Sequence, residues 1–130
     1  MKQPPLANAE LAVMELLWQH QQTPLTARQI REQLYTGASK AQHGTVQRLL
    51  QRLEDKGFVA RDRKLPVHLF SAAIQRDAYA GGQLESLADK LTGGSLAPLI
   101  THLLAEKKIA RDEIDRLRRL LDDNGEEDEL

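Results

Sequence analysis

Apolar residues recur at helical spacing in three stretches of the first half of the chain, and they predict helices over 9–21, 26–35 and 42–56. The second stretch begins at Thr26, with Gln29 three residues later, which is the spacing of a capping box at a helix N-terminus. The third stretch has the clearest buried face, with apolar residues at i, i+3, i+4 and i+7. These residues are Val46, Leu49, Leu50 and Leu53.

The hydrophobic period changes after the third stretch. Residues 58–63 and 67–71 predict two short strands, and residues 64–66 predict a tight connection between them. We call this predicted hairpin the wing. Three helices followed by a hairpin is the element order of a winged helix-turn-helix. We therefore predict a mainly α fold, with a winged helix-turn-helix of three helices plus a β-hairpin wing, followed by a C-terminal helical dimerisation segment.

The outward face of the 42–56 helix is polar and suited to DNA. Arg pairs with guanine, Gln pairs with adenine, and Thr offers a hydroxyl or a methyl group to a base edge. A helix-turn-helix inserts the N-terminal part of its second helix into the major groove, where these side chains are predicted to lie. The alternative is an ordinary amphipathic helix with a solvated outer face. The candidate DNA-binding residues on this helix are His43, Thr45, Gln47, Arg48, Gln51 and Arg52.

Charge adds a second set of candidates. Residues 40–64 hold seven Lys and Arg against three Asp and Glu, although the whole chain has a formal net charge of −1. Such a local excess favours a surface that binds a polyanion. In the wing, Arg61, Arg63 and Lys64 are candidate phosphate contacts, and Lys40 is another. The alternative for the wing is a solvated turn.

The second half of the chain predicts three more helices, over 75–91, from Ser95 onward, and over 110–122. The last two have apolar stripes that little else in the chain can cover. The same helices of a second copy would cover them, and twofold symmetry is the commonest solution. The alternative is that these helices fold back on the winged helix. The predicted dimer interface comprises Leu99, Ile100, Leu103, Leu104, Ile114, Leu117, Leu120 and Leu121.

These elements predict three parts of the chain. Residues 1–73 form a winged-helix DNA-binding domain, residues 74–122 form a helical dimerisation region, and residues 123–130 form an acidic disordered tail.

Several classes of protein are excluded or disfavoured. There is no cysteine, no long apolar run and no signal peptide at the N-terminus, which predicts a cytoplasmic protein without membrane insertion. The four histidines are scattered without metal-ligand spacing, so no metal site and no cofactor are expected. Catalytic motifs such as GxSxG or a P-loop are also absent, and we do not expect an enzyme.

Four motifs resemble those of the BlaI/MecI/CopY family of transcriptional repressors, of the penicillinase repressor type. They are residues 11–18 (LAVMELLW), residues 45–53 (TVQRLLQRL) followed by 56–58 (KGF), residues 93–96 (GGSL) and residues 112–117 (DEIDRL). The likeness covers about residues 6–121, which is nearly the whole chain.

This resemblance implies a homodimer that binds an inverted-repeat operator in double-stranded DNA. It also implies a membrane sensor metalloprotease as a partner, which inactivates penicillinase-type repressors by cleavage in the fifth-helix region. The chain departs from the family in two ways. It has none of the C-terminal cysteines of the copper-responsive branch, and residues 100–104 (ITHLL) lack the Asn-Phe pair typical of the cleavage point.

Two functions from different classes remain open from the sequence. The first is a sequence-specific DNA-binding repressor, and the second is a winged-helix protein-interaction module that does not bind DNA. The basic residues of the 42–56 helix and of the wing favour the first, because an interaction module has no need of them.

Overall fold

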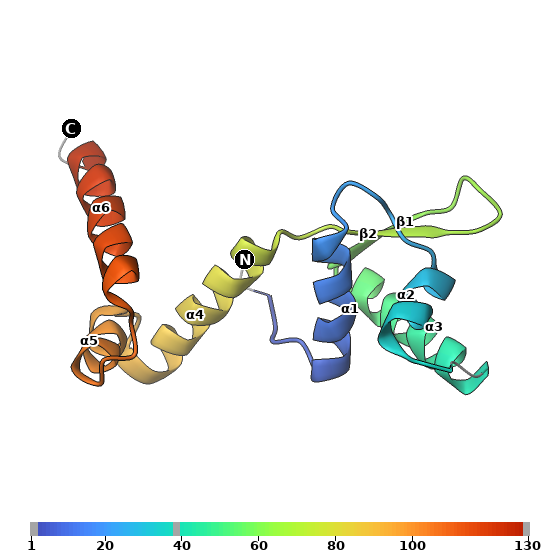
Figure 1. Ribbon diagram of the computed structural model, residues 1–130, viewed down its shortest axis with the longest axis horizontal. Helices are drawn as coiled ribbons and strands as arrows, with labels where there is room; N and C mark the ends of the chain where they lie inside the picture. The colour runs from blue at the N-terminus through green and yellow to red at the C-terminus, as the bar shows by residue number, and fades with distance from the viewer. Residues whose placement is uncertain (1–2, 38–39, 129–130) are drawn as a thin grey trace. The chain divides into compact units, whose positions relative to one another are not determined.

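The computed structural model describes residues 3–37 and 40–128, without the side chains of residues 40–41 and 126–128. The first three helices are α1 (Asn8–Gln19), α2 (Ala27–Leu34) and α3 (Lys40–Asp55). The hairpin follows, with β1 (Val59–Asp62) and β2 (Leu69–Ala72) (Figure 1). The remaining elements are α4 (Arg76–Thr92), α5 (Ala97–Ala105) and α6 (Arg111–Asp128). The mainly helical, winged helix-turn-helix prediction is confirmed.

The predicted start of the second helix is correct in detail. The Thr26 hydroxyl accepts a hydrogen bond from the Gln29 backbone N–H at 3.1 Å. The Gln29 side chain in turn accepts one from the Thr26 N–H at 2.9 Å. Both partners of the capping box are therefore satisfied, and the start of α2 is fixed.

The core lies between α1, α2, α3 and the hairpin. The predicted α3 stripe is fully enclosed, since none of its four residues is more than 2% exposed. Phe70 of β2 bonds through its backbone N–H and C=O to Leu25 in the segment before α2, so the hairpin is attached to the helices through main-chain atoms. The full cluster of buried residues is Val13, Met14, Leu17, Trp18, Leu25, Ile30, Val46, Leu49, Leu50, Leu53, Phe58, Val59 and Phe70.

The wing differs from its prediction in the length of its loop. The strands are antiparallel, with Arg61 opposite Phe70 and Asp62 opposite Leu69. Residues 63–68 therefore form the loop, whereas a tight connection at 64–66 was expected. The sequence predicted too much strand because Arg63 and Val67 fit a strand pattern, while Pro66 between them cannot donate a ladder hydrogen bond.

The chain divides into two compact units, Met1–Leu84 and Glu85–Leu130. The first turns of α4 belong to the first unit because Tyr79 is anchored there. Its ring lies 6.1 Å from the Trp18 ring and 5.7 Å from the Phe58 ring, and its hydroxyl accepts a hydrogen bond from the Leu6 N–H. The first unit thus extends past residue 73, where the sequence predicted its end.

In the second unit, α6 continues through Asp128, although the sequence predicted a helix end near 122 and a disordered tail over 123–130. Glutamate is a good helix former, and the Asn124 side-chain amide donates to the Leu120 carbonyl. Within the described residues, no helix is both long and apolar enough to span a bilayer.

Candidate nucleic-acid interface

The outward face of α3 has the arrangement that the sequence predicts. Gln47, Arg48, Gln51 and Arg52 are exposed, while His43 and Thr45 are half-buried near the start of the helix. This arrangement follows from the 3.6-residue period, which turns these positions away from the buried stripe. Lys40 begins α3, and its side chain lies outside the described part of the structure.

Side chains in the N-terminal half of α3 contact one another. The Gln47 amide nitrogen and His43 Nε2 are 3.0 Å apart, and Arg48 Nη2 donates to the Thr45 hydroxyl at 3.3 Å. Gly44 leaves room for the arginine, because a Cβ at this position would lie 3.4 Å from Arg48 Nη1. These contacts are single, exposed hydrogen bonds, which groups on a duplex can replace at small cost.

A cleft of about 510 Å³ lies between the start of α2, the outward face of α3 and the wing. Arg28 of α2, His43 of α3 and His68 of the wing line it, together with Arg61 of β1. No carboxylate belongs to the described lining of this cleft. The N-terminus of α2 also adds its positive dipole end, so the cleft is suited to an anionic group such as a phosphate.

The wing arginines, which the sequence predicts as phosphate contacts, both contact Glu54 of α3. The Arg61 side chain is only 15% exposed, and its guanidinium lies over the Phe70 ring at 4.7 Å from the centroid. It points toward α3, not outward from the hairpin tip. Arg63 is 56% exposed but is paired with Glu54 of α3 at 2.8 Å. Lys64 is exposed, and its backbone N–H donates to the Asp62 carboxylate.

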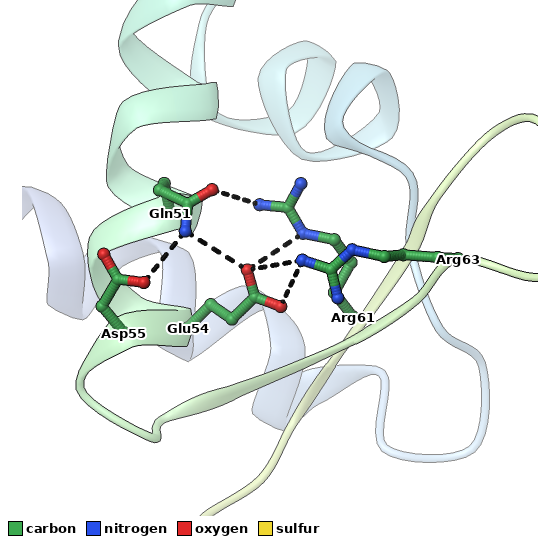
Figure 2. A network of polar contacts seen from close by, with 5 residues as sticks. All are labelled: Gln51, Glu54, Asp55, Arg61 and Arg63. Carbon is green, nitrogen blue, oxygen red and sulfur yellow. Dashed lines mark hydrogen bonds and ion pairs between the residues drawn. The ribbon is translucent and has the colours of Figure 1, made fainter.

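Sequence reasoning missed Glu54 at this surface, as it missed Arg28 and His68 of the cleft. Glu54 lies near the end of α3 and contacts both wing arginines, while Gln51 donates to it and to Asp55 (Figure 2). The sequence did contain a signal for it. Glu54 follows Gln51 by three residues on the same helix face, and Arg61 and Arg63 are two residues apart, which puts them on one side of a strand.

A partly buried ion pair joins the end of α3 to α1, and it was also missed. Lys56 Nζ lies 2.9 Å from Glu10 Oε2, and the other Glu10 oxygen accepts the Ala7 backbone N–H at 3.0 Å. Burial alone would raise the pKa of Glu10, but these two hydrogen bonds and the charges of Lys56 and Arg52 lower it below its ordinary value. Glu10 therefore stays ionised and fixes the C-terminal end of α3 against α1.

The eight residues predicted for a dimer interface are largely uncovered in the described chain. Leu99 and Ile114 are half-buried, and the other six have exposed fractions from 36% at Leu117 to 71% at Leu121. The sequence analysis did not include Leu87 and Leu91 of α4, which are exposed too. A monomeric protein rarely leaves so many large apolar side chains in water.

Taken together, a capped α2, an α3 with a polar outward face and an antiparallel wing define a winged-helix DNA-binding protein. The penicillinase repressor family model matches residues 6–123, and the chain belongs to this family.

Individual proteins are similar to this chain over different lengths. The penicillinase repressor of Bacillus licheniformis is 24% identical over 123 residues, which cover 95% of this chain and 94% of that protein. The solution structure of the DNA-binding domain of the repressor BlaI is 27% identical, with a TM-score of 0.48, and the match covers 61% of this chain and 94% of that one. MepR, a transcription regulator of a Staphylococcus aureus multidrug efflux pump, is 18% identical with a TM-score of 0.47, over 94% of this chain and 79% of that one.

Proposed function

We propose that this protein represses transcription as a homodimer, bound to an inverted-repeat operator with α3 of each copy in a major groove. Its membership of the penicillinase repressor family gives the function class, a DNA-binding transcriptional repressor. The observation that supports the role of α3 is its division into two faces. One face is the enclosed apolar stripe, and the other exposes Gln47, Arg48 and Gln51 beside a cleft whose described lining holds no carboxylate.

Each part of this surface has a distinct task in the proposal. The exposed Gln and Arg side chains of α3 contact base edges and supply sequence discrimination. The cleft at the start of α2, with Arg28 and His68, receives a backbone phosphate and fixes the register of the protein on the duplex. Lys64 and Lys40 add phosphate contacts from the wing and from the start of α3.

The dimer is proposed from the uncovered apolar side chains of α5 and α6. Each Leu or Ile that becomes fully buried contributes about 1.5–3 kcal/mol, so eight partly covered residues can offset the cost of association. Two copies related by a twofold axis would present two α3 helices to two half-sites, which is why an inverted repeat is the expected operator.

Selection of bound duplexes from a random library with the full-length protein tests both parts of the proposal. An inverted repeat whose half-sites are separated by about one helical turn supports the dimer on DNA. Recovery of single half-sites contradicts the dimer. If the protein is not retained on any duplex at low salt, the interaction-module function is favoured in its place.

Two further proposals concern the cell. Because the target is operator DNA, we expect the protein to act in the cytoplasm. From the family we also propose a membrane sensor metalloprotease as a partner. Incubation of the protein with membranes from induced cells, followed by mass spectrometry of the fragments, tests this partner and identifies any cut in α5.

A further inference from the structure

One carboxylate near the end of α3 contacts both arginines of the wing. Glu54 Oε2 lies 2.8 Å from Arg63 Nη2, and Glu54 Oε1 lies 3.3 Å from Arg61 Nε (Figure 2). The Glu54 side chain is only 19% exposed, so its charge is poorly screened by water. The carboxylate therefore forms a polar link from α3 to both arginines of the wing.

This link determines what the wing arginines can contact. Arg61 contacts Glu54 and the face of the Phe70 ring. It also donates a hydrogen bond to the side-chain amide oxygen of Gln51 at 3.3 Å. Arg63 is far more exposed, and a single exposed ion pair is weak. A DNA phosphate competes with Glu54 for Arg63 first, and for Arg61 only if the contacts with Phe70 and Gln51 are also lost.

The same link orients Gln51, a proposed base-contacting residue. Its amide nitrogen donates to Asp55 at 2.9 Å and lies 3.4 Å from Glu54, while its oxygen accepts from Arg61. Both ends of the amide are thus engaged within the protein. A glutamine that pairs with adenine needs its nitrogen and its oxygen together, so the network sets when Gln51 can contact a base.

We propose that Glu54 is a positioning residue that holds the wing arginines on α3 and so limits the number of phosphates the wing contacts. Each phosphate contact strengthens binding to any sequence. By withholding the arginines from phosphates, Glu54 keeps sequence-independent binding weak. This inference rests on the proposed function, since it assumes that the wing and α3 face DNA.

The test compares Glu54→Gln with Asp55→Asn in the full-length protein. Both variants remove one negative charge from the end of α3, but of these two carboxylates Glu54 contacts the wing arginines, whereas Asp55 accepts from Gln51. The measurement is the affinity for a mixed-sequence duplex by fluorescence anisotropy, from about 50 to 200 mM salt. E54Q should steepen the slope of log affinity against log salt by about one to two, whereas D55N should keep the wild-type slope.

The slope also predicts the change in affinity. Each added phosphate contact changes the affinity across this salt range by about threefold, so E54Q should gain affinity for mixed-sequence DNA at the low-salt end. Because a phosphate contact strengthens binding to any sequence, the affinity of E54Q for the duplex recovered by selection should rise by a similar factor. A merely structural role for Glu54 would weaken both complexes and would not steepen the slope.

A second variant keeps the test decisive if E54Q folds poorly. Because Arg63 is held by Glu54 in the wild-type protein, Arg63→Gln should leave the wild-type salt slope unchanged. A slope that becomes shallower by about one in R63Q would mean that Arg63 already contacts a phosphate, and it would overturn the inference. Equal slopes for folded E54Q and D55N would overturn it as well.

Different results would refute the proposed function and the role of Glu54. If the wild-type protein binds no duplex at low salt, DNA binding itself is refuted and so is the role of Glu54. If the wild-type protein binds with a steep salt dependence and E54Q matches D55N, only the role of Glu54 is refuted.

Discussion

The ion pair between Lys56 and Glu10 allows a quantitative prediction for Lys56→Met. Methionine keeps most of the side-chain volume but removes the ammonium group that lies 2.9 Å from Glu10 Oε2. The Glu10 side chain is 4% exposed, so its charge would remain buried, with the Ala7 N–H and the charge of Arg52 still acting on it. The variant therefore tests whether this pair stabilises the packing of α3 on α1.

The expected loss of stability follows from the exposed fractions of the Glu10 and Lys56 side chains. Removal of one partner from a fully buried pair costs about 3–5 kcal/mol. Because Lys56 is 38% exposed, this pair is partly hydrated, and we expect K56M to lower the free energy of unfolding by about 2–3 kcal/mol at pH 7. In the matched variant Glu10→Gln, water can solvate the remaining ammonium, and the amide oxygen can still accept the Ala7 N–H. E10Q should therefore cost only about 1 kcal/mol.

The pH dependence gives this prediction a second, independent part. The folded-state pKa of Glu10 lies below its ordinary value of 4.5, so its contribution to stability is present above that pH and is lost as the pH falls through the folded-state pKa. Burial raises the pKa of Glu10 and Lys56 opposes this effect, so without Lys56 the pKa is higher than in the wild-type protein and the carboxyl group becomes neutral at a higher pH. The stability difference between K56M and the wild-type protein should then shrink between pH 7 and pH 4.

Urea unfolding followed by tryptophan fluorescence is the assay. Trp18 is the single tryptophan of the chain, and it is 5% exposed in the core of the first unit. The pair does not stabilise this unit if K56M costs less than about 1 kcal/mol. A cost that stays the same from pH 7 to pH 4 would refute the charge-based explanation.

Three other substitutions test separate parts of the molecule. Arg48→Ala should cost about 1–3 kcal/mol of binding free energy at one base position of each half-site, measured by competition with single-base operator variants; an equal loss for all sequences would make Arg48 a phosphate contact. Leu103→Asp should shift the sedimentation coefficient from dimer to monomer, whereas Leu65→Asp in the wing loop should not; a dimeric L103D would put the interface elsewhere. Gly57 has φ +83°, which strains any residue with a Cβ, although nothing lies within 4 Å of the added Cβ. Gly57→Ala should therefore lower the free energy of unfolding by about 1–2 kcal/mol in the same urea assay. An unchanged unfolding midpoint would contradict strain at this position.

Much of the first unit could be predicted from the sequence because its signals are local. The stripe from Val46 to Leu53 is a repeat within a single helix, and the capping box of α2 spans only Thr26 to Gln29. In both cases, each residue acts on a neighbour within two turns of helix. The fold class and the outward face of α3 follow from such patterns.

The polar links between elements could not be predicted in the same way. Glu10 and Lys56 are 46 positions apart, and no local sequence pattern indicates which acidic residue pairs with which basic residue at such a separation. Arg61 was expected to contact a phosphate because its charge suits DNA, but the register of the hairpin puts it opposite Phe70, on the side that faces α3. These details depend on how helices and strands pack, which the order of residues along each element does not specify.

The uncovered leucines of α5 and α6 also have a consequence for gene control. If two copies must meet to cover these side chains, the amount of active repressor rises with the square of monomer concentration when the protein is scarce. Dilution at cell growth, or a cut in α5, would then relieve repression more sharply than a proportional loss of protein. The protein concentration at which a target gene is switched would then depend on the apolar side chains of α5 and α6, which lie far along the chain from α3.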